Sequence, residues 1–153
     1  MMYSEMIKKA CLIATEAHKD DFDKGGYPYI MHPYHLAEEM DDEQSICVAL
    51  LHDVVEDHGD KYSFEYLAAQ DFPAAVINAL KLLTHTKGTS YMDYIKALAP
   101  NDIARTVKAA DLSHNLTVSR TDGKKSKKYN LYMEALAYLI KYEVEKENPD
   151  YER

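Results

Sequence analysis

The segment 50–57, Leu-Leu-His-Asp-Val-Val-Glu-Asp, places one imidazole and three carboxylates inside an otherwise apolar stretch. An unpaired carboxylate in an apolar interior is very costly, so the fold must supply a partner for these groups. A divalent metal ion suits a mixture of imidazole and carboxylate best. The other interpretation of this segment is a solvated acidic helix end, but Val54 and Val55 lie inside it.

Chain length and charge limit the classes of protein to consider. The 153 residues are enough to bury a real core, and we expect one domain over residues 1–153. The formal net charge of -8 argues against binding along a nucleic acid backbone, which requires clustered Lys and Arg. It does not exclude a small anionic substrate, because a bound cation can reverse the local potential.

The cysteines and the hydropathy pattern indicate a cytoplasmic protein. Cys11 and Cys47 fall at apolar helical positions, typical of small buried hydrophobic residues in a reducing compartment. No apolar run reaches the length of a membrane span. Glu5, Lys8 and Lys9 interrupt the N-terminal apolar stretch, so we expect no secretory signal and no membrane partner. The oligomeric state stays open.

The apolar periodicity is helical along nearly the whole chain, which has only 5 Gly and 5 Pro. It predicts an all-α fold, a single compact bundle of about eight helices. A first helix is expected at about 3–18, followed by a polar loop at 19–29. Pro33 suits the first position of a second helix, which makes His32 its expected N-cap.

The segment 50–57 is predicted to lie on one continuous third helix that ends near Gly59. Asp41 or Asp42 can cap this helix, with Gln44 placed for a capping box. A polar loop at 119–128 is expected to lead to the last helix. The helices between them are expected to begin at Ser63, Pro73, Ser90 and Asn101.

Four side chains from three predicted helices form a candidate ligand set for one ion. On the third helix, His52 and Asp53 can reach one cation together. Asp111 is a carboxylate on the core stripe of another helix, so it is either a ligand or paired with a neighbouring Lys or Arg. His32 stands at a helix N-terminus, where the positive end of the dipole disfavours imidazolium. Its alternatives are a simple capping or surface His, or replacement by His35.

This set suggests hydrolytic chemistry. Two His and two Asp are typical ligands of Mn²⁺, Fe²⁺ or Zn²⁺. Such an ion lowers the pKa of a water molecule and polarises a phosphoryl group. Glu56 and Asp57 follow one helical turn after the ligands, where either can orient or deprotonate that water.

The order and spacing of His32, His52-Asp53 and Asp111 resemble those of the HD phosphohydrolase superfamily. The stretches 26–33 and 107–116, together with Ala49–Asp57, are similar to the alarmone hydrolase domain of RelA/SpoT homologues. The similarity covers about residues 5–140, which is typical of a stand-alone small alarmone hydrolase.

The resemblance implies a Mn²⁺ ion, or another divalent transition metal, with Glu56 and Asp57 activating the hydrolytic water. It implies removal of the 3′-pyrophosphate from the small nucleotides ppGpp or pppGpp, giving GDP or GTP. The implied metal ligands are His32, His52, Asp53 and Asp111. The implied substrate-binding residues are Lys24, Tyr29, Asn115 and, across an alignment gap, Tyr132.

The chain departs from the family at two places. Asp23-Lys24 stands where the family usually has Arg-Lys, and Thr117 replaces an Arg, with Arg120 further on. An HD-type nucleotide phosphatase acting on NADPH or a nucleoside monophosphate is therefore a second hypothesis. A third is a nucleotide-binding sensor without turnover, which the complete ligand set disfavours. The lysine run at 124–128 is either a further cation source for phosphates or a solvated loop.

Overall fold

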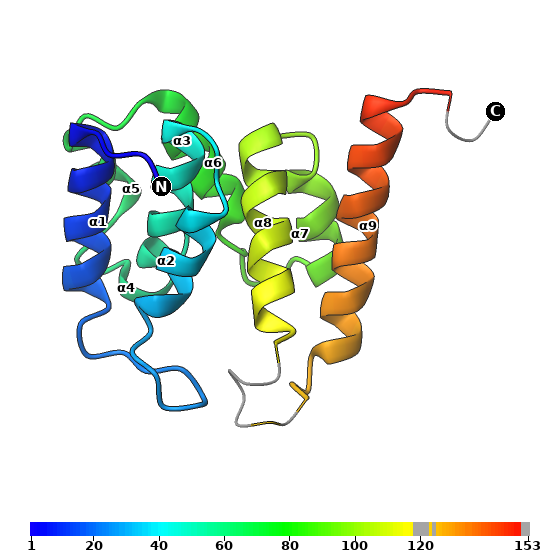
Figure 1. Cartoon of the computed structure of the whole chain (residues 1–153), viewed down its shortest axis with the longest axis horizontal. Helices are drawn as coiled ribbons and strands as arrows, with labels where there is room; N and C mark the ends of the chain where they lie inside the picture. Colours follow the sequence, from blue (N-terminus) through cyan, green and yellow to red (C-terminus); the bar gives the residue numbers. More distant parts are fainter. Residues whose placement is uncertain (118–122, 124, 151–153) are drawn as a thin grey trace.

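The computed structural model describes residues 1–117, 123 and 125–150, and within these ranges it contains α-helices and no β-strand (Figure 1). The predicted all-α fold is therefore confirmed. The helices are α1 (Glu5–Ala17), α2 (Met31–Glu38), α3 (Glu43–Leu51), α4 (Val54–His58), α5 (Phe64–Ala69), α6 (Ala74–Leu83), α7 (Tyr91–Leu98), α8 (Asp102–Asn115) and α9 (Tyr129–Glu147).

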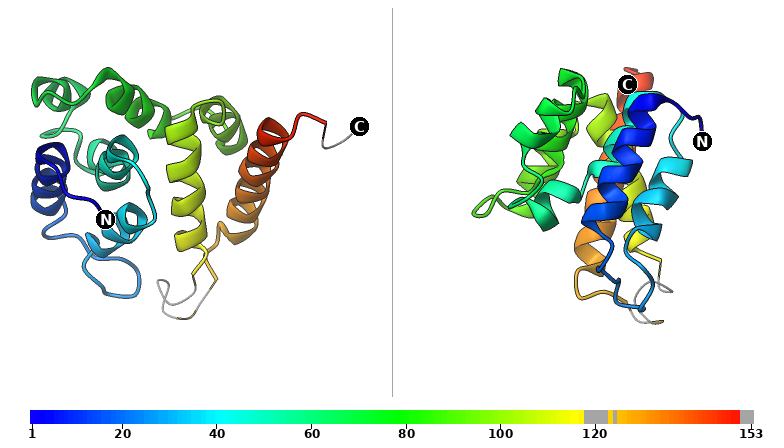
Figure 2. Two further views of the ribbon diagram at one scale, coloured as in Figure 1. Left: turned by 45° about the horizontal axis from the view of Figure 1, so that its top comes forward. Right: turned by 90° about the vertical axis from the view of Figure 1, so that its left-hand side faces the viewer.

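Helix α3 forms the centre of the core. Every residue from Ser45 to Leu51 is buried, because α3 packs against α1, α2, α6 and α8. Figure 2 shows α8 between the group α1–α4 and the long helix α9. In Figure 1 the loop after α1 and the C-terminal end of α8 lie at the same end of the molecule. The last turn of the buried helix α3 thus lies close to both α2 and α8.

Side-chain N-caps define where several helices begin. The side chain of Asp42 accepts the backbone N–H of Ser45, and Asn101 accepts that of Ala104. Each such cap satisfies one of the N–H groups that a helix N-terminus leaves unpaired. The predicted starts at Ser63 and Ser90 are likewise confirmed.

The predicted continuous third helix is wrong. The chain turns at His52 and Asp53, which separate α3 from α4, so the described residues hold nine helices where about eight were expected. Consecutive side chains of a regular helix diverge by about 100° around its axis. Both residues keep αR dihedrals at the turn, and His52 Nε2 and Asp53 Oδ2 lie 2.9 Å apart. Apolar periodicity continues through the turn, so it gave no sign of the break.

The predicted role of His32 as a helix cap is also wrong. Helix α2 begins at Met31 after Ile30, and no side chain caps it. His32 is the second helical residue and Pro33 the third. Since the first N–H groups of a helix have no partner within it, a proline is tolerated at this position as well as at the first.

Neither cysteine forms a disulfide bond with a described residue. Cys11 and Cys47 are free thiols, and Cys47 is buried. In the described part of the chain, none of the helices has both the length and the apolar character needed to span a bilayer.

The central position of α3 predicts a large cost for truncating its side chains. Leu50 is 0% exposed, whereas Leu12 on α1 is 63% exposed. Leu50→Ala should lower the free energy of unfolding by about 2–5 kcal/mol, and the matched control Leu12→Ala by less than about 0.5 kcal/mol. Urea unfolding followed by circular dichroism measures both. Equal losses for the two variants would contradict a core centred on α3.

Candidate metal centre and substrate pocket

The buried ring of His52 lacks a partner for one nitrogen. Its Nδ1 lies 2.7 Å from the carbonyl oxygen of Ala49. A carbonyl only accepts, so Nδ1 carries a proton and donates it there. Nε2 lies 2.9 Å from Asp53 Oδ2 and 3.5 Å from Asp111 Oδ1, yet it makes no hydrogen bond with a described residue. In a neutral ring this nitrogen is a buried lone pair that faces two carboxylates, which requires a cation or a proton between them.

His32 reaches the same place from α2. Its Nε2 lies 2.8 Å from Asp111 Oδ1, and its Nδ1 lies 2.7 Å from Nδ1 of His114. His32, His52 and Asp53 each offer one ligand atom, and these atoms all lie within 4.8 Å of one another. The structure thus brings together the four predicted ligands from α2, α8 and the turn between α3 and α4. The donor set of two imidazoles and two carboxylates fits a divalent transition metal.

Electrostatics at the cluster follow from its burial. Burial by itself lowers the pKa of His52, but the adjacent Asp53 and Asp111 outweigh it and raise the pKa well above its usual value. Burial raises the pKa of Asp111, but the charge of Lys108, the hydrogen bond from His32 and the nearby ring of His52 hold it well below its usual range. The two carboxylates thus favour a positive charge at His52, which either a ring proton or a bound cation can supply.

Asp111 is also paired with a lysine. Its Oδ2 lies 2.9 Å from Nζ of Lys108, and that ammonium lies 5.3 Å from the centre of the Tyr94 ring. The ion pair considered for Asp111 thus exists beside the histidine contact, with one carboxylate oxygen for each. The ammonium of Lys108 reduces the net negative charge of the cluster and fixes the position of the Asp111 carboxylate.

Two adjoining cavities open beside this cluster. A cavity of about 410 Å³ is lined by Asp53, Glu56 and Asp111, and Glu56 Oε1 accepts the backbone N–H of His85 at 3.1 Å. A second cavity of about 240 Å³ is lined by the four predicted substrate-binding residues, Lys24, Tyr29, Asn115 and Tyr132. The last three of these line both cavities, so one substrate can extend from the cluster to the loop after α1.

Two of the residues shared by the cavities also hold the carboxylates. The Tyr29 hydroxyl donates to Asp53 Oδ2, and Asn115 Nδ2 donates to Asp111 Oδ1 at 3.1 Å. Outer hydrogen bonds of this kind orient metal ligands. A substrate that displaces either hydrogen bond would therefore change the orientation of Asp53 or Asp111.

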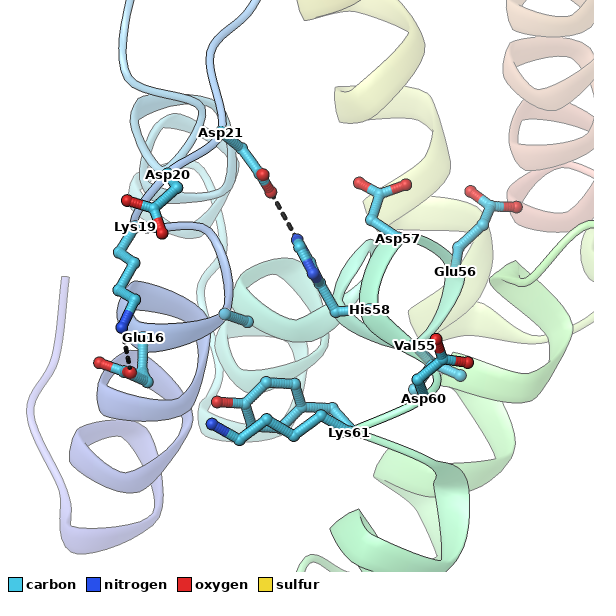
Figure 3. Close-up of a pocket in the computed structure, with 13 residues that line it drawn as sticks. Glu16, Lys19, Asp20, Asp21, Val55, Glu56, Asp57, His58, Asp60 and Lys61 are labelled. Carbon is cyan, nitrogen blue, oxygen red and sulfur yellow. Dashed lines mark hydrogen bonds and ion pairs between the residues drawn. The ribbon is translucent and has the colours of Figure 1, made fainter.

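Asp57 follows Glu56 on helix α4. It lines a third cavity together with Asp21 and His58, whereas Glu56 lines that cavity and the metal-side cavity (Figure 3). Partial desolvation and the nearby carboxylates of Asp53 and Glu56 raise the pKa of Asp57 to about 6. A carboxylate with such a pKa is a better proton acceptor near neutral pH than an ordinary aspartate.

Asp23 has a structural task in the loop after α1. Its Oδ1 accepts the backbone N–H groups of Gly25 and Tyr27, both at 2.9 Å. This residue, which replaces the family's usual Arg, therefore fixes the turn that presents Lys24. Of the lysine run at 124–128, Lys124 lies outside the described residues, as Arg120 does, whereas Lys128 lines the metal-side cavity.

No family model matches the chain. The guanosine-3′,5′-bis(diphosphate) 3′-pyrophosphohydrolase of Haemophilus influenzae is 31% identical over 120 residues, which cover 69% of this chain and 17% of that protein. The bifunctional (p)ppGpp synthase/hydrolase SpoT of Escherichia coli is 30% identical over 122 residues, which cover 72% of this chain and 17% of that protein. The chain therefore spans about a sixth of the length of these relatives.

One solved structure has a fold similar to that of this chain. A metazoan ortholog of SpoT, described as hydrolysing ppGpp, superposes with a TM-score of 0.70 at 22% identity, covering 93% of this chain and 87% of that one. The chain belongs to the RelA/SpoT-homologue family of HD-domain proteins. The predicted family and its helical HD fold are thus confirmed.

Two residues of this RelA/SpoT-homologue domain were not singled out from the sequence as parts of the site. Lys108 was recognisable from its spacing of three residues to Asp111 on a helix, which places both on one face. His114 was assigned to the apolar stripe of α8, and nothing local showed that it would contact His32. That contact joins residues 82 positions apart, so it depends on the tertiary fold.

The raised pKa of Asp57 predicts a pH-dependent stability effect in metal-free protein. Above pH 6 the folded state holds a charge that its surroundings disfavour, whereas near pH 4 the group is protonated in the folded state. Asp57→Asn removes this penalty. The variant should be more stable than wild type by about 1 kcal/mol at pH 7.5, a value reduced for solvent exposure, and the gain should vanish towards pH 4.

Urea unfolding in the presence of a chelator, repeated across this pH range, measures the effect. Asp41→Asn, which removes an exposed carboxylate away from the site, controls for the change in net charge. A gain for Asp57→Asn that is the same at both ends of the range would contradict the raised pKa.

Proposed function

We propose that this chain is a metal-dependent hydrolase that removes the 3′-pyrophosphate from ppGpp or pppGpp, releasing GDP or GTP and pyrophosphate. The observation that carries the proposal is the unpartnered Nε2 of His52, buried between two carboxylates in the wall of a cavity. Relatives named for this hydrolysis, at about 30% identity, support the same substrate class.

The metal in this proposal is Mn²⁺, held by His32, His52, Asp53 and Asp111. When bound, the ion would lower the pKa of a water molecule and polarise the phosphoryl oxygens. His114 would fix the ring of His32, as the Ala49 carbonyl fixes that of His52, so that each keeps one nitrogen for ligation. Lys108 would hold Asp111 by its second oxygen.

In this proposal Glu56 and Asp57 have different roles in activating the water molecule. Glu56 lines the cavity with Asp53 and Asp111, so its carboxylate orients the attacking water. Asp57, with a pKa of about 6, accepts the proton of that water. The ribose 3′-oxygen leaves as the hydroxyl of GDP or GTP, and pyrophosphate carries the transferred oxygen.

The nucleotide would extend over the adjoining cavity. Lys24 offers a cation for a phosphate, Asn115 offers an amide, and the rings of Tyr29 and Tyr132 offer surfaces for ribose and base. The net charge of -8 makes nucleic acid an unsuitable partner. We place this activity in the cytoplasm, in agreement with the free thiols.

A nucleotide phosphatase acting on NADPH or a nucleoside monophosphate is the alternative that Asp23 motivated. Its carboxylate is engaged by the backbone of its own loop, so it need not repel the phosphates of ppGpp. The products separate the two proposals, because the alternative releases orthophosphate and the first proposal releases pyrophosphate.

Purified protein incubated with ppGpp and Mn²⁺ should release pyrophosphate and GDP, as measured by ion-exchange chromatography of the products. Asp53→Ala should lower the rate by at least about 100-fold, because loss of a direct ligand exceeds the cost of losing an outer hydrogen bond. Asp41→Ala, an exposed carboxylate away from the site, is the matched control. Equal activity in wild type and Asp53→Ala would remove the metal-site proposal.

A further inference from the structure

A second cluster of metal-type ligands lies outside the site described above. His18 Nδ1 lies 2.9 Å from Asp21 Oδ2, and His58 Nε2 lies 2.6 Å from the same oxygen. The three residues each offer a ligand atom, and these atoms lie within 4.8 Å of one another. Figure 3 shows the side chains of Asp21 and His58 pointing toward each other from the loop after α1 and from the end of α4.

The ring of His18 resembles that of His52 in one respect. Its side chain is fully buried, and its Nε2 has no hydrogen-bond partner among the described residues. If Nδ1 ligates an ion, the ring proton moves to Nε2, where no existing hydrogen bond is lost. The buried ring can therefore present a lone pair at Nδ1, and metal ligation must offset the loss of the contact to Asp21 and a buried Nε2–H without an acceptor.

The open side of this cluster favours cations. Asp21 and His58 line a cavity of about 510 Å³, and their side chains are 32% and 31% exposed, so an ion can enter. Six carboxylates and two lysines line the same cavity: Glu16, Asp20, Asp21, Glu56, Asp57 and Asp60, with Lys19 and Lys61. This excess of negative charge attracts a cation and disfavours a phosphate.

We propose that His18, Asp21 and His58 form a second metal site, which binds a divalent first-row transition metal of the Zn²⁺ class. Two imidazoles and one carboxylate are a known ligand set for Zn²⁺ with further positions left for water. Ligand atoms around a tetrahedral Zn²⁺ lie about 3.3 Å apart. The nitrogen–oxygen distances here are shorter by less than 1 Å, and rotation of the partly exposed Asp21 carboxylate can lengthen them.

The position of this site gives it a consequence for the domain. An ion there ties the loop after α1, which carries Lys24 and Tyr29, to α4, which carries Glu56 and Asp57. The ring of His18 also packs against Tyr29 with centres 4.9 Å apart. The second ion would therefore fix the loop and the water-activating residues relative to one another. It does not depend on which nucleotide the domain hydrolyses.

Metal stoichiometry tests this proposal without an activity assay. Metal-free protein is dialysed against Zn²⁺ or Co²⁺, and bound metal is measured by mass spectrometry. Wild type should bind two equivalents, and His58→Asn and Asp53→Ala one each. The double variant should bind none. The visible absorption of Co²⁺ in Asp53→Ala protein reports the second site alone, and it should disappear when His58→Asn is added.

Two further variants make the result specific. Asp41→Asn removes an exposed carboxylate outside both clusters and should leave two equivalents bound. Asp21→Asn keeps an oxygen acceptor for both imidazoles but removes the charge, so it should weaken binding of the second metal equivalent at least tenfold.

Far-UV circular dichroism of the metal-free variants verifies folding. Two equivalents in wild type and also in His58→Asn, or no Co²⁺ bound to folded Asp53→Ala, would overturn the second site. Neither outcome bears on ppGpp hydrolysis, which is measured separately.

Discussion

The structure depends on a buried imidazole whose free nitrogen faces two carboxylates. His52 Nε2 lies between Asp53 and Asp111 without a hydrogen bond, and neither carboxylate can donate to it once ionised. Such an arrangement is stable only with a positive charge at its centre. His52 directly follows the last residue of the buried helix α3. The same helix therefore forms the centre of the core and positions this ring.

Helix α4 connects the two halves of the chemistry. It begins directly after Asp53 and ends at His58, so it connects the first candidate metal cluster to the second. Glu56 and Asp57 lie between these ends. Glu56 lines the cavities on both sides, and Asp57 lines the one beside the second cluster. A short helix held at each terminus by a metal cluster would keep two carboxylates in a fixed relation to a water molecule.

Sequence reasoning reached the helical fold and the ligand candidates because both leave local signals. Carboxylates at Asp53 and Asp111 stand on apolar stripes, and caps such as Asn101 mark helix starts. The break between α3 and α4 left no such signal, since the apolar pattern is the same on both sides of it. Lys108, in contrast, was within reach, because its spacing to Asp111 is local.

The second cluster shows where local reasoning stops. His18 and Asp21 are three residues apart, but His58 joins them across 37 positions through the packing of α4 against α1. No spacing rule predicts that meeting. The same holds for His32 and His114, which reach each other only when α2 and α8 both pack on α3.

The central claim is that four side chains from α2, α8 and the α3–α4 turn bind one divalent ion. Crystals grown with Mn²⁺, measured on both sides of the manganese absorption edge, test it most directly. We expect an anomalous difference peak among His32, His52, Asp53 and Asp111, with a nitrogen or oxygen of each within about 2.3 Å. Well-ordered side chains with no peak among them at saturating Mn²⁺ would contradict the account.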